Sequence, residues 1–239
     1  MASRVTRMRS VVSFVRRSSR LNDRQQRAWD QYARDYIVEV PRNDTTTSVD
    51  PSYVFESQEV FGRNARFVLE IGSGVGEAIV ADALNNPDED FLGLEVWNVG
   101  LAQTIVAARR EGPVSNMRLI DVDAAAALPT MFKDQSVDEV RVFFPDPWPK
   151  KKHQKRRIVS PDFAGDIRRI LKPGGDLRLA TDWEEYAEQM REVLDAAPGF
   201  ERAFTGDWAP RFERRVVTKF ERRGIAAGHP IHDLHYMVR

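Results

Sequence analysis

The chain has 239 residues, with 36 lysines and arginines balancing 36 aspartates and glutamates, and it contains no cysteine and four histidines. This length suits one α/β domain with an extension. Without cysteine there is no disulfide framework and no thiolate metal site, and the scattered histidines make a structural metal unexpected. Because no run of about 18 apolar residues occurs, the sequence also predicts no membrane-spanning helix.

The first 50 residues are basic and polar, and we expect residues 1–50 to form a mobile arm ahead of a domain over residues 51–239. Residues 1–36 hold nine arginines against three aspartates, an excess of cations that suits a polyanionic partner. Residues 1–22 are rich in Arg and Ser and lack acids, as organelle transit peptides do. Trp29, Tyr32 and Tyr36 recur at helical spacing, so they either stack on bases or pack against the domain.

The first predicted strand, residues 67–71, leads directly into a glycine turn. Gly72-Ser73-Gly74-Val75-Gly76 follows the strand, and residues 77–85 have helical spacing. Gly72 and Gly74 would let the backbone approach a nucleotide closely, although an ordinary strand-to-helix connection has the same pattern. The dinucleotide-binding pattern needs a further glycine where Glu77 stands, and an acid there disfavours a pyrophosphate.

The next two predicted strands also end in acids. The strand at 90–95 ends at Glu95, whose carboxylate can accept both hydroxyls of a ribose, and a helix is expected over 99–110. The strand at 117–121 is followed by Asp123 at the start of a helix expected over 124–132. Asp123 can accept from an adenine amino group or simply cap that helix.

The fourth predicted strand, residues 138–144, ends at a proline-bracketed aspartate followed by a cationic run. Pro145 and Pro147 stiffen the backbone around Asp146, so its carboxylate is presented from a rigid loop. Six cations fall within residues 150–157, with no acid among them. By itself this segment could also be a turn beside a solvated face.

The remaining pattern continues the alternation of strands and helices. We expect a helix over 160–171, a turn at Pro173-Gly174-Gly175, a strand over 176–181 and a helix over 183–196. The alternation predicts a mostly parallel sheet covered by helices on both faces, with ligands at the carboxyl ends of the strands.

Taken together, these motifs resemble the bacterial tRNA (guanine-N7-)-methyltransferase family, a Rossmann-like group of class I S-adenosylmethionine-dependent methyltransferases. The glycine turn is common to all class I enzymes, whereas Phe144-Pro145-Asp146-Pro147-Trp148 before a basic run is close to diagnostic. The resemblance implies a seven-stranded sheet that ends in an antiparallel hairpin, from residues 200–205 and 232–238. It covers nearly the whole chain through Arg16-Arg17, Leu69–Gly72, Gly93–Glu95, Phe144–Trp148, Lys155–Arg157, Ala180–Trp183 and Thr218–Glu221.

The resemblance implies methyl transfer from S-adenosylmethionine to a variable-loop guanosine, position 46, of tRNA in the cytoplasm, by a monomer or homodimer. It implies that Asp146 is catalytic. The cofactor-binding residues would be Glu70, Gly72, Gly74, Glu95, Asp123 and Asp146. Substrate binding falls to Lys150, Asp182, Thr218, Lys219, Phe220 and Glu221, and RNA binding to Lys152, His153, Gln154, Lys155, Arg156 and Arg157. The sequence departs from the family at Asn98-Val99-Gly100, where Pro-Gly is frequent, and at Pro149, where His or Lys is usual.

Three alternatives remain open at the level of sequence. A nicotinamide oxidoreductase would share the glycine turn and Glu95, but Glu77 breaks its pattern and no His or Tyr is obviously placed for hydride transfer. A noncatalytic RNA-binding module would explain the cations but not the acidic strand ends. Thr218 and Glu221, three residues apart, also suit a capping box at a helix start rather than a substrate site.

Overall fold

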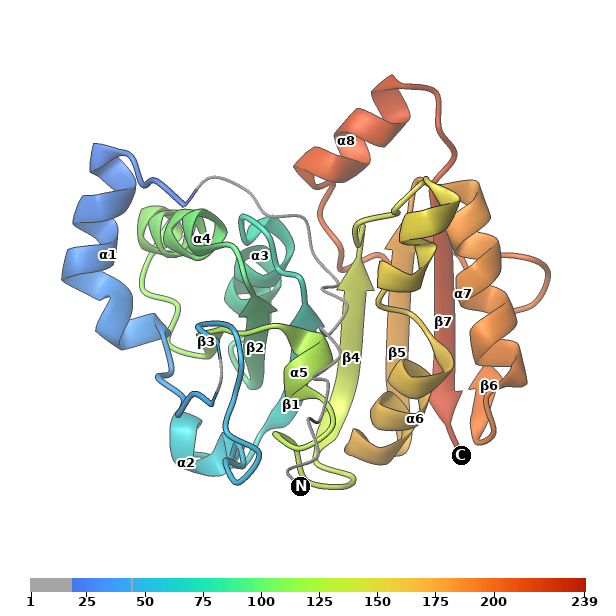
Figure 1. The fold of residues 1–239 in the computed structure, drawn as a ribbon. Coiled ribbons are helices and arrows are strands. Elements are labelled where there is room, and N and C mark those ends of the chain that lie inside the picture. The colour runs from blue at the N-terminus through green and yellow to red at the C-terminus, as the bar shows by residue number, and fades with distance from the viewer. Residues whose placement is uncertain (1–18, 44) are drawn as a thin grey trace, which may run out of the picture.

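The computed structural model describes residues 19–43 and 45–239, which build a seven-stranded sheet between two layers of helices (Figure 1). The strand order is β3-β2-β1-β4-β5-β7-β6. Strands β1 to β5 pair in parallel, whereas β7 runs antiparallel between β5 and β6, which confirms the predicted hairpin. The strands are β1 (Arg66–Ile71), β2 (Glu89–Glu95), β3 (Met117–Asp121), β4 (Val137–Phe143), β5 (Leu171–Thr181), β6 (Phe200–Arg202) and β7 (His232–Val238).

The order of the strands reverses between β1 and β4, because β2 and β3 lie to one side of β1 and β4 and β5 to the other. In open sheets of this kind the crevice for ligands lies at this switch point, outside the carboxyl ends of the strands. Those ends are at the top of Figure 1.

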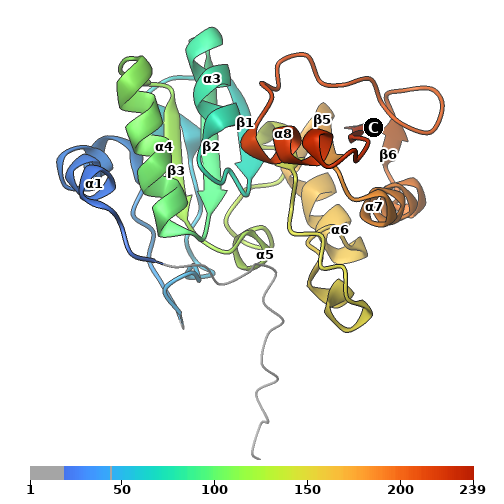
Figure 2. The ribbon, with the colours of Figure 1, turned by 90° about the horizontal axis from the view of Figure 1, so that it is seen from above.

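Helices cover both faces of the sheet, as Figure 2 shows from above. One face carries α1, α3 and α4, and the other carries α5, α6 and α7. Three short elements, α2, η1 and α8, lie in the connections. The helices are α1 (Asp23–Tyr36), α2 (Ser57–Phe61), α3 (Glu77–Asn85), α4 (Asn98–Glu111), α5 (Ala124–Ala127), η1 (Lys151–Arg156), α6 (Pro161–Ile170), α7 (Glu184–Ala196) and α8 (Lys219–Ala226). None of these helices is long and apolar enough to cross a membrane.

Alternation along the strands divides the interior into two kinds of packing. Leu69, Val140 and Leu177 are fully buried and belong to the apolar core beneath α5, α6 and α7. A smaller apolar cluster that includes Val68 and Phe91 lies beneath α1, α3 and α4. Neighbours along a strand point to opposite faces of the sheet. The residues next to Leu69, Val140 and Leu177 in their strands therefore point to the second face, the one that carries α1, α3 and α4.

Over β4 and β5 that second face is ionic rather than apolar. Arg141, fully buried, pairs with Glu139 at 2.7 Å and with Asp82 of α3. Arg214 reaches Asp82 at 2.9 Å from the connection between β6 and α8, and Arg178 of β5 pairs with Glu139 at 3.4 Å. We call these five residues the ionic layer. At this position the sheet is covered by residues of the connection between β6 and α8, such as Arg214, and not by a helix.

The described part of the N-terminal segment packs on the domain. Helix α1 begins at a capping box formed by Asn22 and Gln25 and lies along α4. Beyond it, the backbone N–H of Val38 donates to the carbonyl of Leu119 in β3 at 2.9 Å, and Val40 and Val49 are buried in the main core. This differs from the expectation of a mobile arm over residues 1–50. The physical reason is that α1 has an apolar face, on which Trp29, Tyr32 and Tyr36 pack against the second cluster. Residues 1–18, with Arg16-Arg17, lie outside the described residues.

Two predicted boundaries shift for local reasons. Helix α5 ends at Ala127 rather than near residue 132, because Pro129 has no N–H to continue the helical hydrogen bonds. Strand β5 begins at Leu171, which pairs with Val137, while the next pair is Glu139 with Asp176. The predicted turn at 173–175 therefore loops out within the strand.

Candidate active site

A pocket opens at the carboxyl ends of β1, β2 and β4, where the strand order reverses. Acidic groups come to it from four strand ends, and one wall is formed by the start of α8. Eight of the residues expected to bind cofactor or substrate line this pocket: Glu70, Gly72, Gly74, Glu95, Asp123, Asp146, Thr218 and Phe220.

The glycine turn is packed directly against α4. A Cβ on Gly100 would lie 2.3 Å from the carbonyl oxygen of Gly74, and a Cβ on Gly76 would lie 2.4 Å from Thr104. Gly76 also has a φ of +79°, which disfavours any side chain. Helix α4 thus fixes the position of the glycine turn at the pocket.

Glu95 is held by three backbone amides. The N–H of Gly74 donates to one carboxylate oxygen at 2.7 Å, and those of Val96 and Trp97 donate to the other at 2.8 and 2.9 Å. These bonds tie the end of β2 to the glycine turn.

Glu70 lines the same pocket in a very different environment. Its side chain is buried at the end of β1, opposite Arg141 of β4, and its Oε2 atom has no hydrogen-bond partner among the described residues. Burial raises the pKa of Glu70 to about 7 against the opposing effect of Arg141. A buried carboxyl group at the pocket, with one oxygen that has no partner among the described residues, fits a cationic ligand group.

Of the two roles that the sequence left open for Asp123, the structure shows the capping role. The Asp123 carboxylate accepts from the N–H of Ala125 at 3.1 Å and so caps α5, and the residue also lines the pocket. A carboxylate has acceptor capacity for more than one donor.

The loop that carries Asp146 is fixed at both ends. Phe144 and Trp148 have φ values of 52° and 44°, in the left-handed region that costs energy for residues other than glycine. The N–H of Phe144 donates to the carbonyl of Ala180 at 2.7 Å, and Nε of Arg157 donates to the carbonyl of Pro147 at 2.8 Å. Asp146 is therefore presented to the pocket from a braced loop.

Arg157 departs from its expected role in RNA binding. Its side chain is buried, stacked 4.8 Å from the ring centre of Tyr186, and it contacts Gln189 as well as Pro147. A guanidinium in this position cannot reach a phosphate on the surface. The burial of Arg157 was not predictable from the sequence, because this residue follows five cations in a run whose lysines are exposed.

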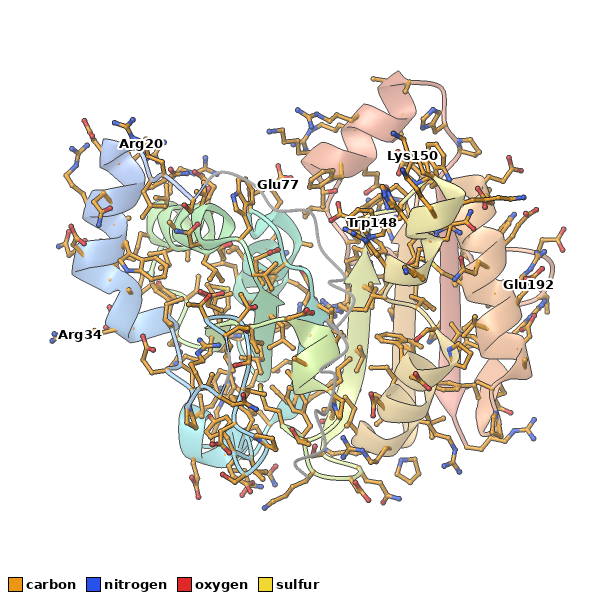
Figure 3. All side chains as sticks on the ribbon, viewed as in Figure 1. Arg20, Arg34, Glu77, Trp148, Lys150 and Glu192 are labelled. Carbon is orange, nitrogen blue, oxygen red and sulfur yellow. The ribbon has the colours of Figure 1, made fainter. Side chains whose placement is uncertain are left out.

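The rest of the basic run forms η1 and its flanks. Lys150, Lys151, Lys152 and Lys155 are exposed. Arg156 lies 4.9 Å from the ring centre of Trp148, and the His153 ring meets the same indole edge-on at 5.8 Å. Gln154 donates to Glu185 of α7. Figure 3 shows Lys150 and Trp148 on this loop, below α8.

The expected substrate segment is divided between the pocket and the interior. Thr218 caps α8 by accepting from the N–H of Glu221 at 3.2 Å. The Glu221 side chain does not return to Thr218 but binds Arg211 at 2.7 Å and Arg215 at 3.2 Å, and it is buried outside the pocket lining. Only one half of the capping box is therefore present.

Asp182, Lys150 and Lys219 also lie outside the pocket lining. Asp182 underlies α8, where a Cβ on Gly224 would come within 2.7 Å of it. His229 approaches the same carboxylate at 3.5 Å.

A family model described as "Putative methyltransferase" matches residues 64–234. A tRNA (guanine-N(7)-)-methyltransferase of Cutibacterium acnes is 46% identical over 95% of this chain and 82% of its own length. Proteins of the same name in Nocardioides sp. and Paenarthrobacter aurescens are 45% and 38% identical over 98% and 95% of this chain, and 89% and 91% of their own lengths. The chain belongs to the tRNA (guanine-N7-)-methyltransferase family.

Solved structures agree with the class I methyltransferase fold of this family. The 16S rRNA methyltransferase KamB aligns with a TM-score of 0.56 at 16% identity, over 76% of this chain and 91% of that one. A 16S rRNA (adenine(1408)-N(1))-methyltransferase from Catenulisporales acidiphilia gives 0.54 at 20% identity, over 84% and 98%.

Within this family member, sequence reasoning missed a buried cluster behind the pocket. Arg215 is fully buried and pairs with Glu221 and with Asp233 of β7, and its guanidinium lies 5.2 Å from the ring centre of Phe143. We call Arg211, Arg215, Glu221 and Asp233 the arginine cluster. An arginine-rich stretch at 211–215 was visible in the sequence, but its carboxylate partners lie on separate elements.

Proposed function

We propose that this chain transfers a methyl group from S-adenosylmethionine to N7 of a variable-loop guanosine in tRNA. The observation that carries the proposal is the convergence of Glu70, Glu95, Asp123 and Asp146 on one pocket at the switch point of the sheet. The relatives named for this activity match nearly the whole chain, so the pocket and the basic loop are both within the aligned region.

The residues present fit the cofactor group by group. Glu70 has a buried oxygen without a partner among the residues that the structure describes, which suits the α-ammonium of the methionine moiety. Glu95 and Asp123 both line the pocket, and they would accept from the ribose hydroxyls and from the adenine amino group. When bound, S-adenosylmethionine supplies a sulfonium methyl group that is ready for transfer.

Asp146 would position the guanine and stabilise it as it becomes cationic. N7 of guanine carries a lone pair in the ring plane, so the attack needs no general base. The Asp146 carboxylate can accept from the amino and imino groups of guanine, which adenine does not present in the same pattern. Holding the two reactants in contact contributes up to about 7 to 11 kcal/mol in favourable intramolecular systems.

The exposed lysines of η1 and its flank would hold the tRNA backbone near this pocket. Lys150, Lys151, Lys152 and Lys155 are free of the packing that buries Arg157. Each phosphate that a lysine neutralises releases counterions, so affinity should fall with salt. A tRNA substrate also supports the cytoplasmic location expected from the sequence.

A methyl-transfer assay on unmodified tRNA tests the proposal. The enzyme is incubated with labelled S-adenosylmethionine and a tRNA transcript, and the labelled base is identified after digestion. We expect 7-methylguanosine at a single variable-loop position, and no label in a transcript with adenosine there. Binding of NAD in preference to S-adenosylhomocysteine, or label in another base, would contradict the proposed function.

A further inference from the structure

In the sequence, Glu77 served only as evidence against a pyrophosphate ligand. The proposed methyl transfer assigns no role to this residue. In the structure it is the first residue of α3, immediately after the glycine turn, and it lines the pocket. Its carboxylate crosses to the opposite wall: Oε2 accepts from the backbone N–H of Lys219, and Oε1 accepts from Nη2 of Arg222 at 2.6 Å. Figure 3 shows Glu77 beside one end of α8.

These contacts place one carboxylate between two helix starts. Helix α3 begins at Glu77 and α8 begins at Lys219. The positive ends of the two helix dipoles would repel each other at close approach, and an anion between them is stabilised by both. The contact therefore depends on the charge of Glu77 as well as on hydrogen bonding.

The two residues that flank Lys219 form the pocket wall. Thr218 and Phe220 both line the pocket, together with the glycine turn. Helix α8 is held at two points. Glu221 binds Arg211 and Arg215 of the arginine cluster, and the backbone N–H of Lys219 donates to Glu77. The Glu77 end of this link is rigid, because the turn that precedes it packs on Gly100 and Thr104 of α4.

We infer that Glu77 is a positioning residue that draws α8 against the glycine turn and so holds Thr218 and Phe220 over the bound cofactor. The inference rests on the proposed use of S-adenosylmethionine at this pocket. Loss of Glu77 should loosen the wall without removing any group that touches the reacting atoms. Cofactor and product should then exchange faster, while the glycine turn, Glu70 and Glu95 remain in place.

The test compares the dissociation of S-adenosylhomocysteine from wild type, Glu77→Ala and Arg222→Met. Dissociation is followed by stopped-flow fluorescence of Trp97, which lines the pocket. In Glu77→Ala we expect the rate constant to rise between about three- and tenfold, the scale for losing a charge-assisted hydrogen bond at a partly exposed site. Arg222→Met should give a smaller increase and add little to Glu77→Ala in the double variant.

Salt provides a second readout that a purely structural role would not move. The Glu77 and Arg222 side chains are 33% and 55% exposed, so ions can screen their pairing. Salt should accelerate dissociation from wild type and have less effect on Glu77→Ala. Glu77→Gln, which retains an oxygen acceptor for Lys219 but not the charge, should lie between wild type and Glu77→Ala.

Glu201→Gln is the matched control, because Glu201 forms an exposed pair with Arg239 at the far edge of the sheet. Its dissociation rate should equal that of wild type. An unchanged rate constant in Glu77→Ala, with or without a lower melting temperature, would overturn the inference. Failure of wild type to bind S-adenosylhomocysteine would instead overturn the proposed function, so the two failures are distinguishable.

Discussion

Glu70 carries its carboxyl group in surroundings that favour the neutral form, yet its proposed ligand requires the ionised form. Burial raises the pKa of Glu70 to about 7, and a bound ammonium group would lower it again. Cofactor affinity should therefore strengthen as pH rises from 6 to 8. The ionised Glu70 carboxylate, which the cofactor requires, thus lowers the stability of the protein without cofactor.

Replacing Glu70 with glutamine should make the empty protein more stable at high pH. The folded-state pKa of about 7 exceeds the ordinary value of 4.5, so between these values the folded state holds the extra proton. This contribution is complete below pH 4.5 and is lost as pH rises through 7. At pH 8 we expect Glu70→Gln to gain about 2 kcal/mol in the free energy of unfolding, within the limit set by about 1.4 kcal/mol per pKa unit.

Urea unfolding at pH 5 and pH 8 measures this effect. The gain should be small at pH 5 and larger at pH 8, while binding of S-adenosylmethionine is lost at both. Glu201→Gln, at an exposed position, should keep the pH dependence of wild type. Equal stability of Glu70→Gln and wild type at pH 8 would contradict the assigned environment.

Asp146→Ala should reduce the single-turnover rate of methyl transfer by about two orders of magnitude, as when a preorganised electrostatic group is removed. The fold should survive, because the hydrogen bonds of Phe144 and Arg157 hold the loop and remain in this variant. The measurement is rapid quench with saturating tRNA and cofactor, together with a thermal melt. A rate near that of wild type would remove Asp146 from the mechanism.

The acids at the strand ends were predictable one by one, because parallel strands bring their carboxyl ends to one edge. Glu95, Asp123 and Asp146 meet there as expected, together with Glu70, which only the family resemblance had indicated. The burial of a side chain by residues from other helices and strands was not predictable in the same way. Arg157 and Glu221 have the sequence surroundings of surface residues, and only the packing of α7 and of the arginine cluster removes them from solvent.

At the scale of elements, the basic run at residues 150–157 has two different roles. The exposed lysines of η1 are available to bind RNA, and Arg157 supports the Asp146 loop. Replacing Lys151, Lys152 and Lys155 with glutamine should weaken tRNA binding. The slope of log affinity against log salt should become shallower by about one for each phosphate that is no longer neutralised.

Arg157→Met provides the contrast. The slope against salt should stay as in wild type, whereas turnover and the melting temperature should fall, because the carbonyl of Pro147 and Tyr186 lose their partner. Filter binding at several salt concentrations and a thermal melt separate the outcomes. A reduced salt slope in Arg157→Met would restore its expected role as an RNA contact.

The regular elements were predictable to within a few residues where periodicity is strong. Strand β1 was expected over 67–71 and spans 66–71, and α7 was expected over 183–196 and spans 184–196. The short elements α2 and η1 were not predicted, because they have too few residues for a period, whereas the start of α8 at Thr218 was one of the alternatives left open. Helix α5 was overestimated, since its alanine run is helical in propensity but Pro129 stops it.

At the scale of the molecule, the described N-terminal segment contributes to the core, and Tyr36→Ala should show it. Tyr36 is buried against β3 and α4, so truncation should lower the free energy of unfolding by about 3 kcal/mol. Gln31→Ala, on the exposed side of α1, should change it by less than about 0.5 kcal/mol. Chemical denaturation of both variants is the measurement, and equal stabilities would indicate that α1 is detached in solution.

The ionic layer between β4, β5 and the connection to α8 has a consequence for the response of this enzyme to heat. Charged groups are hydrated less favourably as temperature rises, so the penalty for burying Arg141, Glu139 and Asp82 becomes smaller on warming. A comparable apolar layer would instead add to the heat capacity of unfolding and steepen the curvature of stability with temperature. The ionic face of β4 and β5 should therefore lose less of its contribution to stability near the melting point than the apolar face of the same strands beneath α6.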